Sequence, residues 1–82
     1  MSGRPLRTFA VLGFATTHTA LAAEQLLRDL GVPVTPIPAP ASIGNGLCGI
    51  ALRLEPGDVE RADTLLERAE LRVAARGDIE DV

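Results

Sequence analysis

Hydrophobic residues along the chain fall into short apolar runs separated by two stretches with helical periodicity. The first run, FAVLGF at residues 9–14, follows a lead-in of proline and arginine residues. Its length and apolar character are typical of a buried β-strand. We therefore expect the fold to begin with a strand inside a sheet.

The next stretch has the three- and four-residue spacing of an amphipathic helix. Glu24 and Arg28 lie on its polar face as a favourable i,i+4 pair. The hydroxyl of Thr16 or Thr17 can cap its start, and Gly31 can supply the left-handed residue at its end. The apolar positions that share the inner face are Ala20, Ala23, Leu27 and Leu30.

Two further strands are expected, joined by a loop. Residues 34–38 predict an edge strand, because their two prolines cannot donate to a strand ladder. Residues 39–46 are rich in proline, glycine, serine and asparagine, which predicts a loop. Alternation resumes over residues 48–54 and predicts a third strand, with Cys48 and three aliphatic residues on its core face.

A second helix and a last strand complete the pattern. Residues 56–58 (PGD) open a helix whose inward positions are Val59, Ala62, Leu65, Leu66 and Ala69. Residues 71–75 predict the last strand, and the acidic residues 77–82 predict a frayed tail. The whole chain, 1–82, is then a single domain, ordered from about residue 8 to residue 76.

The resulting order is β-α-β-β-α-β, which predicts an α+β, ferredoxin-like fold. Two helices would cover one face of a four-stranded antiparallel sheet. The residues left for the other face, such as Gly49 and Ala51, are small and uncharged. An uncovered apolar face usually marks an interface, so we expect a homodimer or a partner protein to cover it.

Composition supports the expectation that another chain covers this face, and it narrows the possible classes of function. Only 2% of the 82 residues are aromatic, so the core has few large anchors. The chain has eight arginines, no lysine and 11 acidic residues. It has no run of basic residues that could bind the phosphates of nucleic acid, so we expect no nucleic-acid partner. No run approaches the length of a membrane span, so we expect a cytoplasmic protein with no membrane partner.

The chain has one cysteine, Cys48, and one histidine, His18. A single cysteine cannot form an intrachain disulfide, and one cysteine with one histidine is too few ligands for a zinc site closed by protein residues alone. No other motif indicates a metal or a cofactor. In the expected topology, Cys48 lies near Phe14 and the start of the first helix. A helix N-terminus stabilises a thiolate, and His18 could add to this if its ring turns towards the thiol.

Structural alternatives stand beside each of these assignments. Cys48 shares the parity of core residues, and a free cysteine often acts as a small buried hydrophobe. His18 could be an exposed residue of the first helical turn. The backbone of residues 44–46 (GNG) could cradle an anion, or it could form a hairpin tip. The candidate binding positions around the thiol are Thr16, Thr17, Gly46 and Gly49.

The order of several short motifs resembles a known family. These are TTHTALAAE at 16–24, GVPV at 31–34, IPAP at 37–40 and CGIALR at 48–53. They resemble a small bacterial family of putative selenium/sulfur carrier-like proteins, over most of the chain from residue 9 to residue 69. Two departures lie beside the cysteine. Ala41 stands where the family commonly has arginine, and residues 44–47 stand where it commonly has serines.

The resemblance implies a carrier rather than a turnover enzyme. In that role Cys48 would accept sulfur or selenium from a cysteine desulfurase-type donor, as a persulfide or selenopersulfide, and pass it to an acceptor protein. One cysteine suffices, because the group moves between proteins. Two alternatives remain open: a binding or assembly module acting through the open sheet face, and a thiol redox sensor that dimerises through Cys48.

Overall fold

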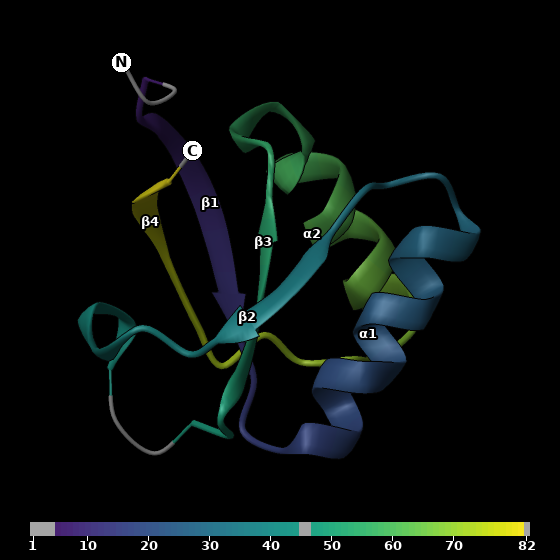
Figure 1. Cartoon of the computed structure of the whole chain (residues 1–82). Helices are drawn as coiled ribbons and strands as arrows, with labels where there is room; N and C mark the ends of the chain where they lie inside the picture. Colours follow the sequence, from purple (N-terminus) through teal and green to yellow (C-terminus); the bar gives the residue numbers. More distant parts are fainter. Residues whose placement is uncertain (1–4, 45–46, 82) are drawn as a thin grey trace.

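A computed structural model describes residues 5–44 and 47–81. Within these ranges the chain forms four strands, two α-helices and two short 3₁₀ turns (Figure 1). In chain order these are β1 (Arg7–Gly13), α1 (Thr17–Asp29), β2 (Thr35–Pro38), η1 (Ala41–Ile43), β3 (Ile50–Leu54), η2 (Pro56–Asp58), α2 (Val59–Arg68) and β4 (Ala75–Asp81).

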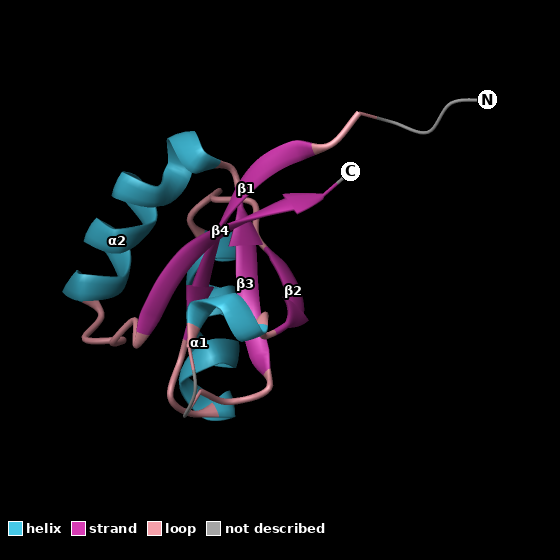
Figure 2. Ribbon diagram, turned by 90° about the vertical axis from the view of Figure 1, so that its left-hand side faces the viewer, coloured by secondary structure: helices cyan, strands magenta, loops and turns pink. Residues whose placement is uncertain are grey.

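The four strands form one antiparallel sheet in the order β2-β3-β1-β4. Both helices pack on the same face of this sheet (Figures 1 and 2). The predicted α+β, ferredoxin-like fold is therefore confirmed. The proline-containing β2 lies at one edge, as expected, because Pro36 and Pro38 have no N–H to offer a second neighbour.

The core lies between the sheet and the two helices. β1 and β3 contribute their alternate side chains, α1 contributes one stripe and α2 a shorter one. The largest fully buried side chains of this core are Phe14, Leu12, Leu27, Leu52 and Leu66. Leu30, predicted to face inward, is instead 44% exposed, because α1 ends at Asp29 and the chain turns there.

The last strand differs from the sequence prediction. The strand predicted at 71–75 was wrong, and so was the frayed tail over residues 77–81, because β4 runs over Ala75–Asp81 and pairs with the full length of β1. Val82, the last residue of the predicted tail, lies outside the described residues. Leu71 and Val73 are instead partly buried in the connection, packed against the core. The seven residues of β1 offer a free ladder edge, and pairing with it outweighs the acidic composition of the segment.

The sheet face opposite the helices also differs from the expectation of an uncovered apolar surface. Phe9, Val11 and Ala51 lie on this face, yet each is at most 5% exposed. The guanidinium groups of Arg7 and Arg53 stack on the Phe9 ring, with Cζ atoms 4.6 and 4.4 Å from its centroid. The chain therefore covers much of this face with its own side chains.

Candidate functional site

Cys48 lies two residues before β3 and is tied by its backbone to the end of β1. Its N–H donates a hydrogen bond of 2.9 Å to the carbonyl oxygen of Phe14. The topology had predicted this proximity to Phe14. Phe14 is followed closely by the first turn of α1, so the cysteine and the helix start share one end of the molecule (Figure 1).

The thiol is half-buried and held by a weak hydrogen bond. Its Sγ atom donates to the carbonyl oxygen of Ile50, 3.2 Å away. The side chain packs against the core cluster on the helix side of the sheet. Cys48 is thus neither an enclosed core residue nor a freely exposed one.

Thr16 caps α1, as predicted for Thr16 or Thr17. Its Oγ1 accepts a hydrogen bond of 3.1 Å from the backbone N–H of Thr19, and the two hydroxyls lie 2.9 Å apart. Thr17 is exposed at the first helical position. His18 is also exposed, and no hydrogen bond or ion pair joins it to Cys48 among the residues described. Cys48 and the N-terminus of α1 therefore lie at the same end of the fold, but within the described residues the Cys48 thiol and the His18 imidazole form no direct bond.

The two glycines proposed as binding positions have different outcomes. Gly46 lies outside the described residues. Gly49 is exposed, and a Cβ atom built on it would meet nothing within 4 Å. Close packing therefore does not require glycine at position 49.

Sequence reasoning missed a contact that places the segment leading to Cys48. The connection from β2 to β3 turns through η1 and lies over the sheet face opposite the helices (Figures 1 and 2). There the side chain of Ile43 covers Gly13 in β1 and Gly77 in β4, and Leu47 covers Gly13. A glycine within a strand often marks a close approach by another segment, so Gly13 and Gly77 were the available signal.

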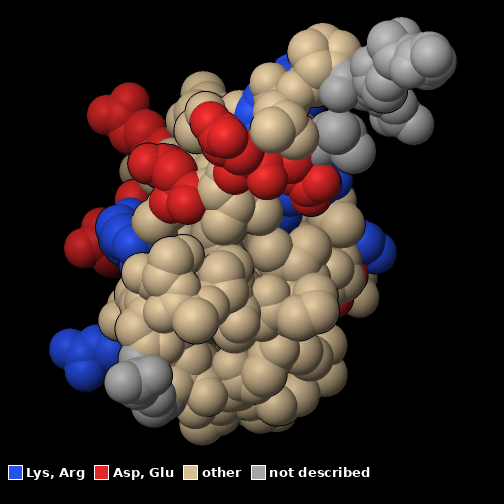
Figure 3. Space-filling model, turned by 60° about the vertical axis from the view of Figure 1, so that its left-hand side comes forward, with Lys and Arg blue, Asp and Glu red and all other residues tan. Residues whose placement is uncertain are grey.

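The stretches of chain around Phe14 and Cys48 contain no charged residue. The chain has no Asp, Glu, Lys or Arg over residues 8–23 or over residues 30–52. Figure 3 shows one face with a broad uncharged surface, and with acidic side chains gathered at the end near the two termini.

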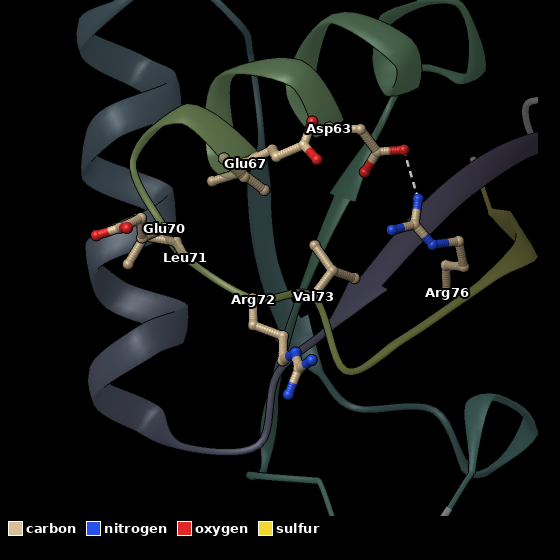
Figure 4. Close-up of a pocket in the computed structure, with 8 residues that line it drawn as sticks. Asp63, Glu67, Glu70, Leu71, Arg72, Val73 and Arg76 are labelled. Atoms are coloured by element: carbon tan, nitrogen blue, oxygen red, sulfur yellow. Dashed lines mark hydrogen bonds and ion pairs between the residues drawn. The ribbon is translucent and has the colours of Figure 1, made fainter.

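A separate hollow of about 430 Å³ lies beside the C-terminal half of α2 (Figure 4). An ion pair between Asp63 and Arg76 spans it, and Oδ1 of Asp63 is buried without a hydrogen-bond partner among the described residues. Its lining residues are Asp63, Leu66, Glu67, Glu70, Leu71, Arg72, Val73 and Arg76. Cys48 is not among them, so this hollow is not part of the predicted site.

Within residues 5–44 and 47–81, no group of three or more His, Cys, Asp or Glu side chains could hold a metal ion. No helix in these ranges is long and apolar enough to cross a membrane.

Comparison with known proteins gives one match. The family described as "Putative Se/S carrier protein-like" matches residues 9–75 of the chain. No curated protein and no solved structure matches it. The matched range runs from the third residue of β1 to the first residue of β4 and includes Cys48.

Proposed function

Because the chain belongs to the family described as "Putative Se/S carrier protein-like", we propose that it carries sulfur or selenium on Cys48 between proteins. The observation that supports this role most directly is the setting of the thiol. It is the only cysteine of the chain, and it is half-buried and lies in an uncharged stretch of the sequence. We place the carrier in the cytoplasm, where a lone cysteine stays reduced.

The transfer chemistry needs one thiol and no external oxidant. The Cys48 thiolate attacks the outer sulfur of a persulfide on the donor protein. A new S–S bond forms at Sγ of Cys48, the S–S bond of the donor breaks, and the donor cysteine leaves as a thiolate with the electron pair. The acceptor then repeats the step on the persulfide of Cys48, or the corresponding step on a selenopersulfide.

Neighbouring groups are proposed to support the thiolate in this reaction. The N-terminus of α1, capped by Thr16, carries a partial positive charge on the same end of the fold. The exposed imidazole of His18 lies in its first turn and can rotate at little cost. Thr17 and the backbone near Gly46 and Gly49 are proposed to contact the incoming protein.

Loading of the thiol tests the proposal. The protein is incubated with a cysteine desulfurase and cysteine, and its intact mass is measured. We expect a gain of one sulfur atom that is absent in Cys48→Ser, which preserves the size of the side chain. The same assay with selenocysteine reports on selenium.

If no adduct forms under conditions that load an established sulfur carrier, the carrier role is refuted. A disulfide-linked dimer formed under mild oxidant would instead favour the redox sensor. Light scattering on Cys48→Ser tests the assembly module, which predicts an oligomer that does not depend on the thiol.

A further inference from the structure

The η1 turn is held against the sheet by a single large side chain, Ile43. A Cβ atom built on Gly77 would lie 2.7 Å from Cγ2 of Ile43, and one built on Gly13 would lie 2.9 Å from its Cδ1. The methyl groups of Ile43 therefore occupy the space that side chains at these two positions would need. We call the surface formed by Gly13 and Gly77 the glycine floor.

The segment around Ile43 is a compact unit with a fixed base. The N–H of Ile43 donates to the carbonyl of Pro40, and that of Gly44 donates to Ala41, so these bonds stay within the turn. At the base, the N–H of Ala39 donates a hydrogen bond of 3.0 Å to the carbonyl of Gly49. Ala41, Ser42 and Gly44 are exposed, whereas Ile43 is half-buried. The η1 turn can therefore move away from the sheet as a rigid unit when Ile43 loses its contact with the glycine floor.

The same floor is connected to Cys48. Cδ1 of Leu47 lies 2.9 Å from the Cβ position of Gly13, so Leu47 and Ile43 share one contact surface. Leu47 packs on the sheet face opposite the helices, while the next residue, Cys48, packs against the core on the helix side. Residues 47 and 48 thus place their side chains on opposite faces of the sheet at the end of β1. The packing of Leu47 on the face opposite the helices limits how far Cys48 can move.

We propose that Ile43 is a positioning residue for the thiol: seated on the glycine floor it keeps Cys48 half-buried, and its release exposes Cys48 to a partner protein. The identity of that partner rests on the proposed carrier function. The link between Ile43 and the thiol does not, because it can be measured with a small reagent alone.

The test is the rate at which iodoacetamide alkylates Cys48 in the folded protein. Ile43→Ala removes the contact with the floor. Gly77→Ala pushes Ile43 away from β4, and its new methyl group meets no side chain other than Ile43 within 4 Å. We expect each variant to raise the alkylation rate roughly tenfold. Ile43→Val, which loses Cδ1 and keeps Cγ2, should give an intermediate rate.

Three controls separate positioning from general loosening. Gly57→Ala introduces a methyl group into open space and should leave the rate unchanged. Leu65→Ala truncates a half-buried residue of α2, away from the floor, and should lower stability without a comparable rise in rate. In the Ile43→Ala background, Gly77→Ala should add nothing, because the group it displaces is gone.

The proposal is overturned if Ile43→Ala leaves the rate at that of the unmodified chain. It is also overturned if Leu65→Ala raises the rate as much as Ile43→Ala does, because global unfolding would then control access. Failure of the carrier role is a different result, in which Ile43→Ala accelerates alkylation but the desulfurase loads neither protein.

Discussion

The backbone N–H of Cys48 donates a hydrogen bond to the carbonyl of Phe14, which joins a position two residues before β3 to the residue after β1. This bond involves no side chain, so it places position 48 whatever residue occupies it. Substitutions at Cys48 should therefore test the chemistry of the thiol without displacing the segment. Phe14 itself is fully buried, which anchors the acceptor end of the bond.

His18 is expected to support the Cys48 thiol from the first turn of α1 without a fixed contact. His18→Gln keeps a polar side chain of similar reach and removes the imidazole. We expect the alkylation rate of Cys48 to fall by about two- to threefold, the small effect of an exposed group that makes no direct bond to the thiol. An unchanged rate would assign His18 to the exposed surface of α1 alone.

Thr16 should matter for stability through its cap. Thr16→Ala leaves the N–H of Thr19 without its side-chain acceptor, and we expect the free energy of unfolding to fall by about 1 kcal/mol. The measurement is urea denaturation followed by circular dichroism. Thr17→Ala is the matched control, and should change stability by less than about 0.5 kcal/mol, because Thr17 makes no cap bond.

The two helices end with the same hydrogen bonds but with different residues in the left-handed position. Gly31 has a φ of 82° after α1, and Glu70 has a φ of 60° after α2. The next residue in each case donates back to the helix, Val32 to Leu27 and Leu71 to Leu66. Glycine adopts this conformation without the Cβ clash that glutamate suffers.

Glu70→Gly should therefore raise the free energy of unfolding by about 0.5–1 kcal/mol, since it removes the strain at the end of α2. Gly31→Ala should lower it by about 1 kcal/mol for the converse reason. Thermal unfolding of both variants measures these changes. A destabilised Glu70→Gly would contradict the assignment and indicate that its carboxylate makes a stabilising contact.

Arg53 should contribute more to stability than Arg7, although both stack on Phe9. Arg53 bonds to Asp81 of β4 at 2.7 Å and its side chain is 22% exposed, whereas that of Arg7 is 57% exposed. Arg7 pairs with the exposed carboxylate of Glu55, also at 2.7 Å. We expect Arg53→Ala to cost about 1–2 kcal/mol and Arg7→Ala less than about 1 kcal/mol, because solvent screens the more exposed Arg7–Glu55 pair.

Arg53→Lys separates the two contributions, because it keeps the charge beside Asp81 and loses the planar stacking on Phe9. An intermediate stability in urea denaturation is the expected result. Equal effects of Arg7→Ala and Arg53→Ala would show that burial does not distinguish the two arginines.

The sequence predicted those parts of the fold that depend on neighbours in the chain. The three- and four-residue spacing from Ala20 to Leu27, the threonine cap and Gly31 are local signals, and α1 follows them closely. The proximity of Cys48 to Phe14 was also predictable, because a β-α-β-β order brings the end of β1 and the entry to β3 together. Both depend on periodicity and connectivity alone.

The last strand and the cover of the open sheet face depend on contacts between distant segments. Residues 77–81 have the composition of a tail, yet the free edge of β1 makes them a strand. Likewise, nothing near Ile43 in the chain indicates that Gly77 will lie beneath it. Pairing and packing energies between such segments do not show in a local pattern.

Local patterning was thus enough for the order of helices and strands, the ferredoxin-like arrangement and the one cysteine able to carry chemistry. Tertiary structure alone decided how far the Cys48 thiol is exposed and which side chains pack beside its segment. The reason is physical: burial depends on which side chains meet across the sheet, and here Ile43, Leu47 and the glycine floor come from three separate parts of the chain.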